Sequence, residues 1–145
     1  MESKWNEALC EVTSKSLEEL CFLIPASDDV GFEDEPVTAA AFVAFAGPTT
    51  GIVLIEMRGQ LLQEIASNML GDDASEAARR DALGEVANIL CGHIVPVVWG
   101  VEAVFSLRRP EFPEDLGAAL KTREAFAAGS VAFDSGSADV TLFVD

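Results

Sequence analysis

Residues 81–92 constrain the fold more than any other stretch, because they predict a helix with two faces of opposite character. At about 100° per residue, the residues on one face fall within roughly 60° of arc. This polar face carries Asp81, Glu85, Asn88 and Gly92. The opposite face carries Leu83, Val86 and Leu90. The apolar stripe is typical of a helix packed on a core, so the fold must bury one side of this helix and leave the other open.

The polar face differs from an ordinary solvated helix surface, which usually mixes Lys with Glu. No cation occurs between Asp81 and Gly92. Asn88 is unfavourable inside a helix, because its side chain competes with the backbone for hydrogen bonds, and this favours a functional role. Asp81 fits a helix-dipole role in the first turn equally well. We interpret the face as a carboxylate and a carboxamide one turn apart, beside a flat glycine where another surface could approach.

Apolar spacing and turn residues divide the rest of the chain into helices and strands. We expect helices at 4–24, 60–70 and 116–122, and a long helix that begins after a Ser75 N-cap and extends towards residue 98. We expect strands at 37–46, 51–57, 101–107, 126–134 and 138–144. Pro25 and Gly71 should close helices, and Pro96 should kink or end the long one.

This order predicts an α+β fold, with long helices packed on a largely antiparallel sheet. At 145 residues, the chain is large enough to bury a real core. No segment is rich enough in Pro, Gly or Ser to separate two domains, so we expect residues 1–145 to form one domain.

The net charge of −16 argues against binding to nucleic acid or to anionic membranes. The apolar stretch 89–105 is interrupted by polar residues, Gly and Pro, and falls short of the ~20 apolar residues that a spanning helix needs. No signal peptide is visible, and three cysteines without a disulfide-like pattern suggest a reducing compartment. We therefore expect a cytoplasmic protein. The pairs 79–80 and 108–109, both Arg-Arg, could bind a local anion, but a solvated role is favoured.

The sequence contains no recognisable metal site, catalytic triad or phosphate-binding loop. Its single histidine, His93, and its isolated cysteines are too few for a metal site, and we expect His93 to be a buried or partly buried neutral side chain. The sequence contains no phosphate-binding Gly-x4-Gly-Lys loop and no Ser/His/Asp arrangement. We therefore predict that the chain carries no metal or cofactor of its own.

The pattern Asp-x3-Glu-x2-Asn at Asp81, Glu85 and Asn88 resembles the signature of the CheC/CheX/FliY chemotaxis phosphatases. Members of that family remove the phosphoryl group from the response regulator CheY. Residues 45–57 resemble the family's first hairpin, and residues 61–71 resemble the helix that follows it. The resemblance therefore covers most of the chain, in the family's order.

The resemblance also implies an internal pseudo-repeat, in which a long helix, paired strands and a short helix occur twice. The first helix offers Glu7-x3-Glu11-x2-Ser14, where Ser stands in the position of the Asn. This set fits a degenerate copy of the motif, but a solvated helix face is favoured. A single complete motif makes the chain resemble CheX more than CheC or FliY. Pro110 lies close to the position of a proline that the family places downstream of the Asn.

The resemblance implies a mechanism in which the partner supplies most of the reacting groups. The partner would be a phosphorylated CheY-like receiver domain, which would also hold the Mg²⁺, and the protein would be a homodimer. Asn88 would position the water that attacks the aspartyl phosphate, and Glu85 would contact the partner's active-site lysine. Asp81, Gly84 and Gly92 would lie against the partner surface.

Two other functions fit the same residues. The first is a non-catalytic binding module that keeps the fold and docks a receiver domain or another signalling protein. The second is a homo-oligomeric scaffold that associates through exposed strand edges. A catalyst should lose turnover when Asn88 is replaced, a binding module has no turnover to lose, and a scaffold should assemble beyond a dimer without a partner.

Overall fold

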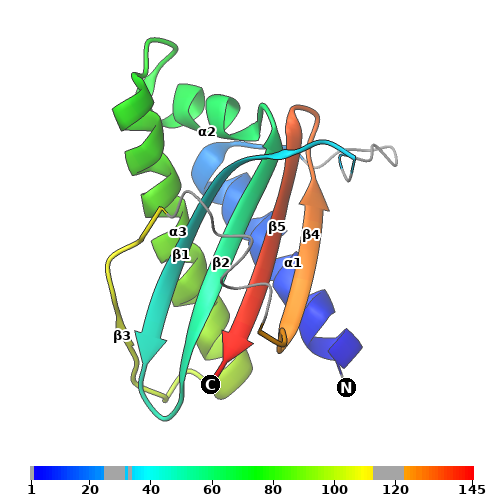
Figure 1. Ribbon diagram of the computed structural model, residues 1–145, viewed down its shortest axis with the longest axis vertical. Helices are drawn as coiled ribbons and strands as arrows, with labels where there is room; N and C mark the ends of the chain where they lie inside the picture. The colour runs from blue at the N-terminus through cyan, green and yellow to red at the C-terminus, as the bar shows by residue number, and fades with distance from the viewer. Residues whose placement is uncertain (1, 25–31, 33, 113–122) are drawn as a thin grey trace.

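The computed structural model describes residues 2–24, 32, 34–112 and 123–145. The elements, in chain order, are α1 (Glu2–Cys21), β1 (Val37–Ala46), β2 (Thr50–Gly59), α2 (Leu61–Leu70), α3 (Glu76–Trp99), β3 (Ser106–Leu107), β4 (Ala127–Ala132) and β5 (Gly136–Val144). The helices lie on one face of the sheet, with α1 and α3 crossing behind it in Figure 1. This arrangement confirms the predicted α+β fold with long helices on an antiparallel sheet.

The five strands form one antiparallel sheet in the order β3-β1-β2-β5-β4. β1 and β2 form the predicted hairpin, in which Phe45 pairs with Gly51. A Cβ atom on Gly51 would lie 2.3 Å from the carbonyl oxygen of Phe143 and 2.6 Å from the Phe45 ring. Only glycine therefore fits where the hairpin lies against β5 and a buried aromatic ring.

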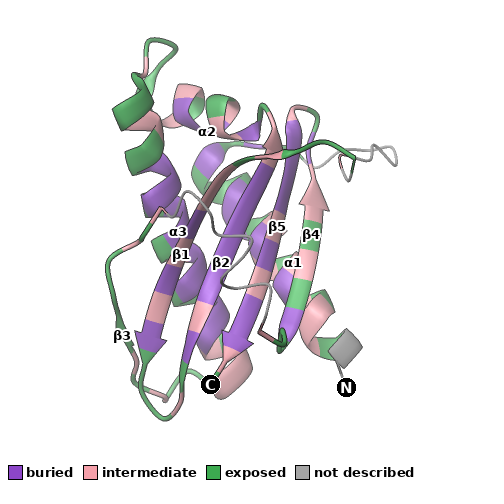
Figure 2. Cartoon of the chain, viewed as in Figure 1, coloured by how far each residue is buried: buried purple, intermediate pink, exposed green. Residues whose placement is uncertain are grey.

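The core lies between the sheet and the helices, because every second residue of the central strands faces α1 and α3. The inward residues are buried and are Ala41, Val43 and Phe45 of β1, Val53, Ile55 and Met57 of β2, and Ala138, Val140 and Leu142 of β5. α1 packs mainly on β4, α3 packs on β1, and the two helices also contact each other. Figure 2 shows the buried residues running along the central strands and the helix sides that face them.

α3 is the longest element and carries the polar face. Its N-cap is Ser75, whose side-chain oxygen accepts a hydrogen bond from the Ala78 N–H at 3.1 Å, as predicted. The helix continues past Pro96 to Trp99, close to the expected residue 98, so of the two expected effects of Pro96, a kink or an end, the end does not occur. α3 is long and apolar enough to cross a membrane, but core helices of globular proteins also meet these two criteria. Half of its most apolar stretch is buried in this fold.

Two segments differ from the sequence prediction. α1 ends at Cys21 rather than at residue 24, because Phe22 adopts a left-handed backbone with φ 57° that stops the helix. The expected strand 101–107 is wrong except for its last two residues. Its first residues follow the turn at Gly100 and leave Val101 and Val104 more than 80% exposed. The expected helix at 116–122 lies outside the described residues.

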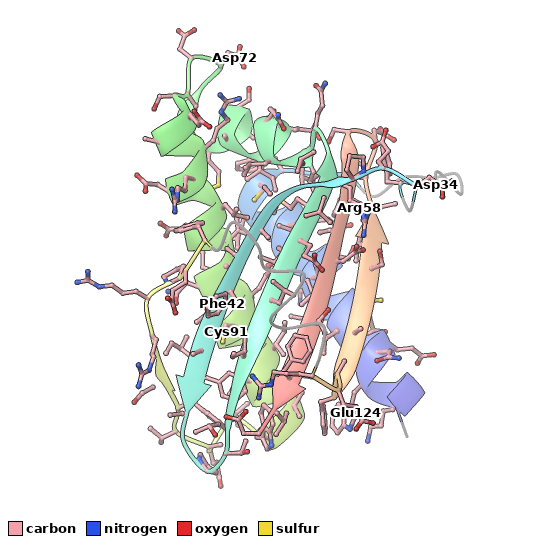
Figure 3. All side chains as sticks on the ribbon, viewed as in Figure 1. Asp34, Phe42, Arg58, Asp72, Cys91 and Glu124 are labelled. Atoms are coloured by element: carbon pink, nitrogen blue, oxygen red, sulfur yellow. The ribbon has the colours of Figure 1, made fainter. Side chains whose placement is uncertain are left out.

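The three cysteines are free thiols, and they differ in burial. Cys21 and Cys91 are buried, whereas Cys10 is half-buried, with its Sγ 3.6 Å from the Ser130 carbonyl oxygen. Cys91 lies where α3 passes behind the sheet (Figure 3). Burial in an apolar environment disfavours the thiolate and raises the pKa of Cys91 to about 12 and that of Cys21 to about 11.

We expect the Ser75→Ala variant to lower the free energy of unfolding by about 1 kcal/mol, because it removes the acceptor for one orphan N–H group of α3. Chemical denaturation followed by circular dichroism measures this change. Ser106→Ala, at an exposed position on β3, is the matched control and should change the free energy by less than about 0.5 kcal/mol. Equal losses in both variants would show that the cap does not stabilise α3.

We expect a thiol reagent at pH 8 to modify Cys10 first, because Cys21 and Cys91 are buried and remain protonated far above that pH. Titration of the native protein should give one fast-reacting thiol, and titration in denaturant should give three. Three equally fast thiols in the native protein would contradict the burial seen here.

Candidate functional site

The predicted polar face is present on α3. Asp81, Glu85, Asn88 and Gly92 are exposed. The residues between them are mostly buried: Ala82, Leu83, Gly84, Val86, Ala87, Leu90 and Cys91. The backbone of the site is therefore fixed by the core, and its three polar side chains project from a helix that is packed on its other side.

The segment after β3 runs along the outer edge of β1 and comes close to this face. Leu107 pairs with Phe45, and the Arg108 N–H donates to the Ala44 carbonyl oxygen at 2.9 Å. Glu111 then exchanges two hydrogen bonds of 2.9 Å with Phe42. The register shifts by one residue between these pairs, so Arg109 and Pro110 together lie opposite Val43.

This shift is a β-bulge, and it explains the position of Pro110. Proline has no N–H to donate to a neighbouring strand, so it occurs in sheets at edges and bulges. A bulge also turns the side chains next to it away from the regular pleat. Here it places Arg109 and Pro110 beside the polar face of α3. Pro110 is thus a structural residue that shapes the site, consistent with the proline expected from the resemblance.

The two segments enclose an open cleft of about 420 Å³. We call it the motif cleft; its lining residues are Asp81, Gly84, Glu85, Asn88, Arg109, Pro110 and Phe112. The structure thus brings together four of the five residues predicted for the site. Gly92 is not among the lining residues. It lies one turn farther along α3, where a Cβ atom would be 3.9 Å from Cδ1 of Leu107.

Gly84 is covered by the protein's own chain. A Cβ atom at this position would lie 2.8 Å from Cζ of Phe112 and 3.5 Å from Cβ of Pro110. The absence of a side chain therefore lets Phe112 reach the backbone of α3. The guanidinium group of Arg80 lies over the Phe112 ring, 4.6 Å from its centroid, in a cation–π contact. The close approach that Gly84 permits here is to Phe112.

Sequence reasoning missed Arg109 and Phe112 as lining residues. A solvated role was favoured for the pair Arg108–Arg109. In the structure, Arg109 lines the motif cleft, whereas Arg108 is not among its lining residues. Composition does not distinguish the two residues. The available signal was Pro110, which marks an irregular edge strand. The register of that strand, which decides which arginine faces α3, depends on the bulge.

His93 is exposed, so the prediction of a buried or partly buried side chain is wrong. Its Nδ1 atom lies 2.8 Å from Oγ of the buried Ser16, and this hydrogen bond joins α3 to α1. Helix packing explains the difference, because His93 is at the margin of the apolar stripe rather than within it. Within the described part of the chain, no three His, Cys, Asp or Glu side chains are placed to hold a metal ion.

The chain is similar in fold to solved structures of chemotaxis proteins. Chemotaxis protein CheX from Vibrio vulnificus has a TM-score of 0.70 at 17% identity, with 100% of this chain and 99% of that chain covered. Chemotaxis protein CheX from Desulfovibrio desulfuricans has a TM-score of 0.67 at 16% identity, with 98% and 99% covered. A CheX–CheY–BeF3–Mg²⁺ complex from Borrelia burgdorferi contains a chain with a TM-score of 0.63 at 19% identity, with 95% and 96% covered.

No curated protein has significant sequence similarity to the chain. The sequence pattern of a protein family, described as chemotaxis phosphatase CheX, matches residues 39–133. This match includes most of β1, the whole of β2 and α3, and the bulged edge segment, so it includes every residue that lines the motif cleft. The chain therefore belongs to the CheX family of chemotaxis phosphatases.

Proposed function

We propose that the protein hydrolyses the aspartyl phosphate of a CheY-like receiver domain. The observation that carries the proposal is the motif cleft, where Glu85 and Asn88 project from a helix that is otherwise held by the core. Membership of the CheX family supports the reaction class. A related chain in a solved complex with CheY, BeF3 and Mg²⁺ supports a receiver partner, since BeF3 stands in for a phosphoryl group.

Asn88 is the residue that we assign to water positioning. Phosphoryl transfer needs an attacking oxygen in line with the leaving carboxylate, and most of the catalysis comes from alignment. A carboxamide has both a donor and an acceptor, so it can hold a water molecule with one lone pair directed at phosphorus. Asn88 is exposed on a rigid helix, and its side chain can therefore enter a partner's pocket without rearrangement of the backbone.

Glu85 is assigned to partner contact, one helical turn before Asn88. Its exposed carboxylate can pair with the active-site lysine of the receiver and so fix the register in which the two proteins meet. Asp81 lies a further turn away in the same cleft and would contact the partner's rim. Gly92 leaves the next part of the helix surface flat, which allows a close approach beyond the cleft.

The metal chemistry would belong to the partner. The related complex of CheX with CheY contains BeF3 and Mg²⁺ together, which supports a Mg²⁺ ion held by the receiver that carries the phosphoryl group. Mg²⁺ would neutralise the developing charge on the phosphoryl oxygens. The proposal places the protein in the cytoplasm with its phosphorylated substrate.

We expect Asn88→Ala to slow receiver dephosphorylation by on the order of 10²–10³, the usual cost of removing a preorganised hydrogen-bonding group. The measurement is phosphate release from a phosphorylated CheY-type receiver domain with Mg²⁺ and catalytic amounts of the protein. Because Asn88 is exposed, the variant should keep its thermal stability and its affinity for the receiver.

Glu18→Ala is the matched control, since Glu18 is an exposed acid on α1 and is not among the residues of the motif cleft. It should leave the rate unchanged. Wild-type protein that binds receivers without accelerating phosphate loss would overturn the phosphatase proposal and favour a docking module.

We also propose a homodimer. β4 ends the sheet, and in the described part of the chain no strand pairs with its outer edge. A second copy could continue the sheet there by antiparallel pairing. Sedimentation equilibrium without a partner should give the mass of two chains. A single-chain mass would contradict the dimer, and a larger assembly would favour the scaffold.

A further inference from the structure

A minority of the cations of this acidic chain lie in and beside the motif cleft. The chain has 25 acidic residues and nine Lys or Arg residues. Three of the nine line two neighbouring depressions that share Phe112: Arg109 in the motif cleft, and Arg79 and Arg80 in a second depression of about 580 Å³ between β1, α2 and the first turns of α3. We call these three residues the arginine strip.

The strip is built by contacts of the fold. The bulge at Pro110 places Arg109 beside α3, and the cation–π contact between Arg80 and Phe112 holds Arg80 at the boundary between the two depressions. The two ion pairs among the described residues, Arg58–Asp139 and Arg123–Asp145, do not involve the strip. Arg80 and Arg109 are exposed and Arg79 is half-buried, so the strip is accessible to a docked protein.

In the proposed reaction, acidic groups of the two proteins repel each other, and the arginine strip can offset this repulsion. A receiver that holds Mg²⁺ beside an aspartyl phosphate must carry carboxylates there, because Mg²⁺ prefers oxygen ligands from acidic side chains. This protein has a net charge of −16 and presents Asp81 and Glu85 to the same pocket. Like charges brought together across an interface oppose association unless cations separate them.

We infer that the arginine strip, with Arg109 as its principal member, docks the carboxylates that surround the receiver's phosphorylation pocket. This inference rests on the proposed function. Arginine suits the role because its planar guanidinium group can bind a carboxylate through two parallel hydrogen bonds. The phosphoryl charge is already met by Mg²⁺ and the receiver's lysine, so the strip determines affinity and choice of partner and takes no part in water attack.

The test compares Arg109→Ala with Arg108→Ala, which removes the same charge from the adjacent exposed position outside the motif cleft. The probe is a CheY-type receiver domain carrying beryllium fluoride and Mg²⁺. Arg109→Ala should raise Kd about fivefold at about 0.1 M salt, whereas Arg108→Ala should change Kd by less than about twofold. Arg109→Glu should weaken binding further, and the difference from wild type should shrink at about 1 M salt, where charges are screened within about 3 Å.

Steady-state kinetics separate docking from chemistry. Arg109→Ala should raise KM about as much as it raises Kd and change kcat by less than about twofold, since a rim charge acts on association. A loss of kcat at unchanged Kd would overturn the inference and assign Arg109 to the reacting phosphoryl group. Equal effects of the two alanine variants, or no effect of either, would also overturn it.

The binding assay separates failure of this inference from failure of the proposed function. Wild-type protein that binds the receiver without dephosphorylating it would refute the proposed catalysis. The Kd values of Arg109→Ala and Arg108→Ala would still show whether Arg109 docks the receiver. A wild-type protein that binds no CheY-type receiver would overturn both.

Discussion

The packing of α3 against β1 and the neighbouring helices is the interaction on which the rest of the structure depends. Nine residues of α3 are buried, and they form the core stripe and the support of the motif cleft at the same time. Because the exposed acids and Asn88 share a rigid helix with these residues, their relative positions follow from helix geometry. These three side chains therefore need no loop to be ordered before a partner arrives, and little of their backbone entropy is lost on docking.

Much of the fold followed from local patterns. The central hairpin, the helix at Leu61–Leu70, the Ser75 cap and the closing hairpin were all predictable, because periodic burial and turn residues agree there. The segment 101–107 was expected to form a strand because its apolar residues alternate as in a strand. After the turn at Gly100, however, only Ser106 and Leu107 reach the edge of β1, and the residues before them lie outside the ladder. Pairing across the sheet is not visible in one strand's own sequence.

The sequence predicted the helix side of the candidate site but not the opposite wall of the motif cleft. A helix motif is local, so Asp81, Glu85 and Asn88 could be placed on one face from spacing alone. The opposite wall of the motif cleft could not, because Arg109 and Phe112 reach α3 through a register shift on the edge strand. Gly84 was expected to allow the close approach of a partner, whereas in the structure Phe112 of the same chain lies against it. Which group packs against Gly84 is thus determined by tertiary contacts, which the local sequence does not reveal.

Pro96 has a consequence for the surface beyond the cleft. In a regular α-helix each carbonyl oxygen accepts from the N–H four residues later. Proline has no N–H, so the carbonyl oxygen of Gly92 lacks that donor although α3 continues to Trp99. Gly92 is exposed and has no side chain to shield its backbone. The polar face therefore ends in a main-chain acceptor, a fixed partial negative charge that a donor group from solvent or from a docked protein can satisfy.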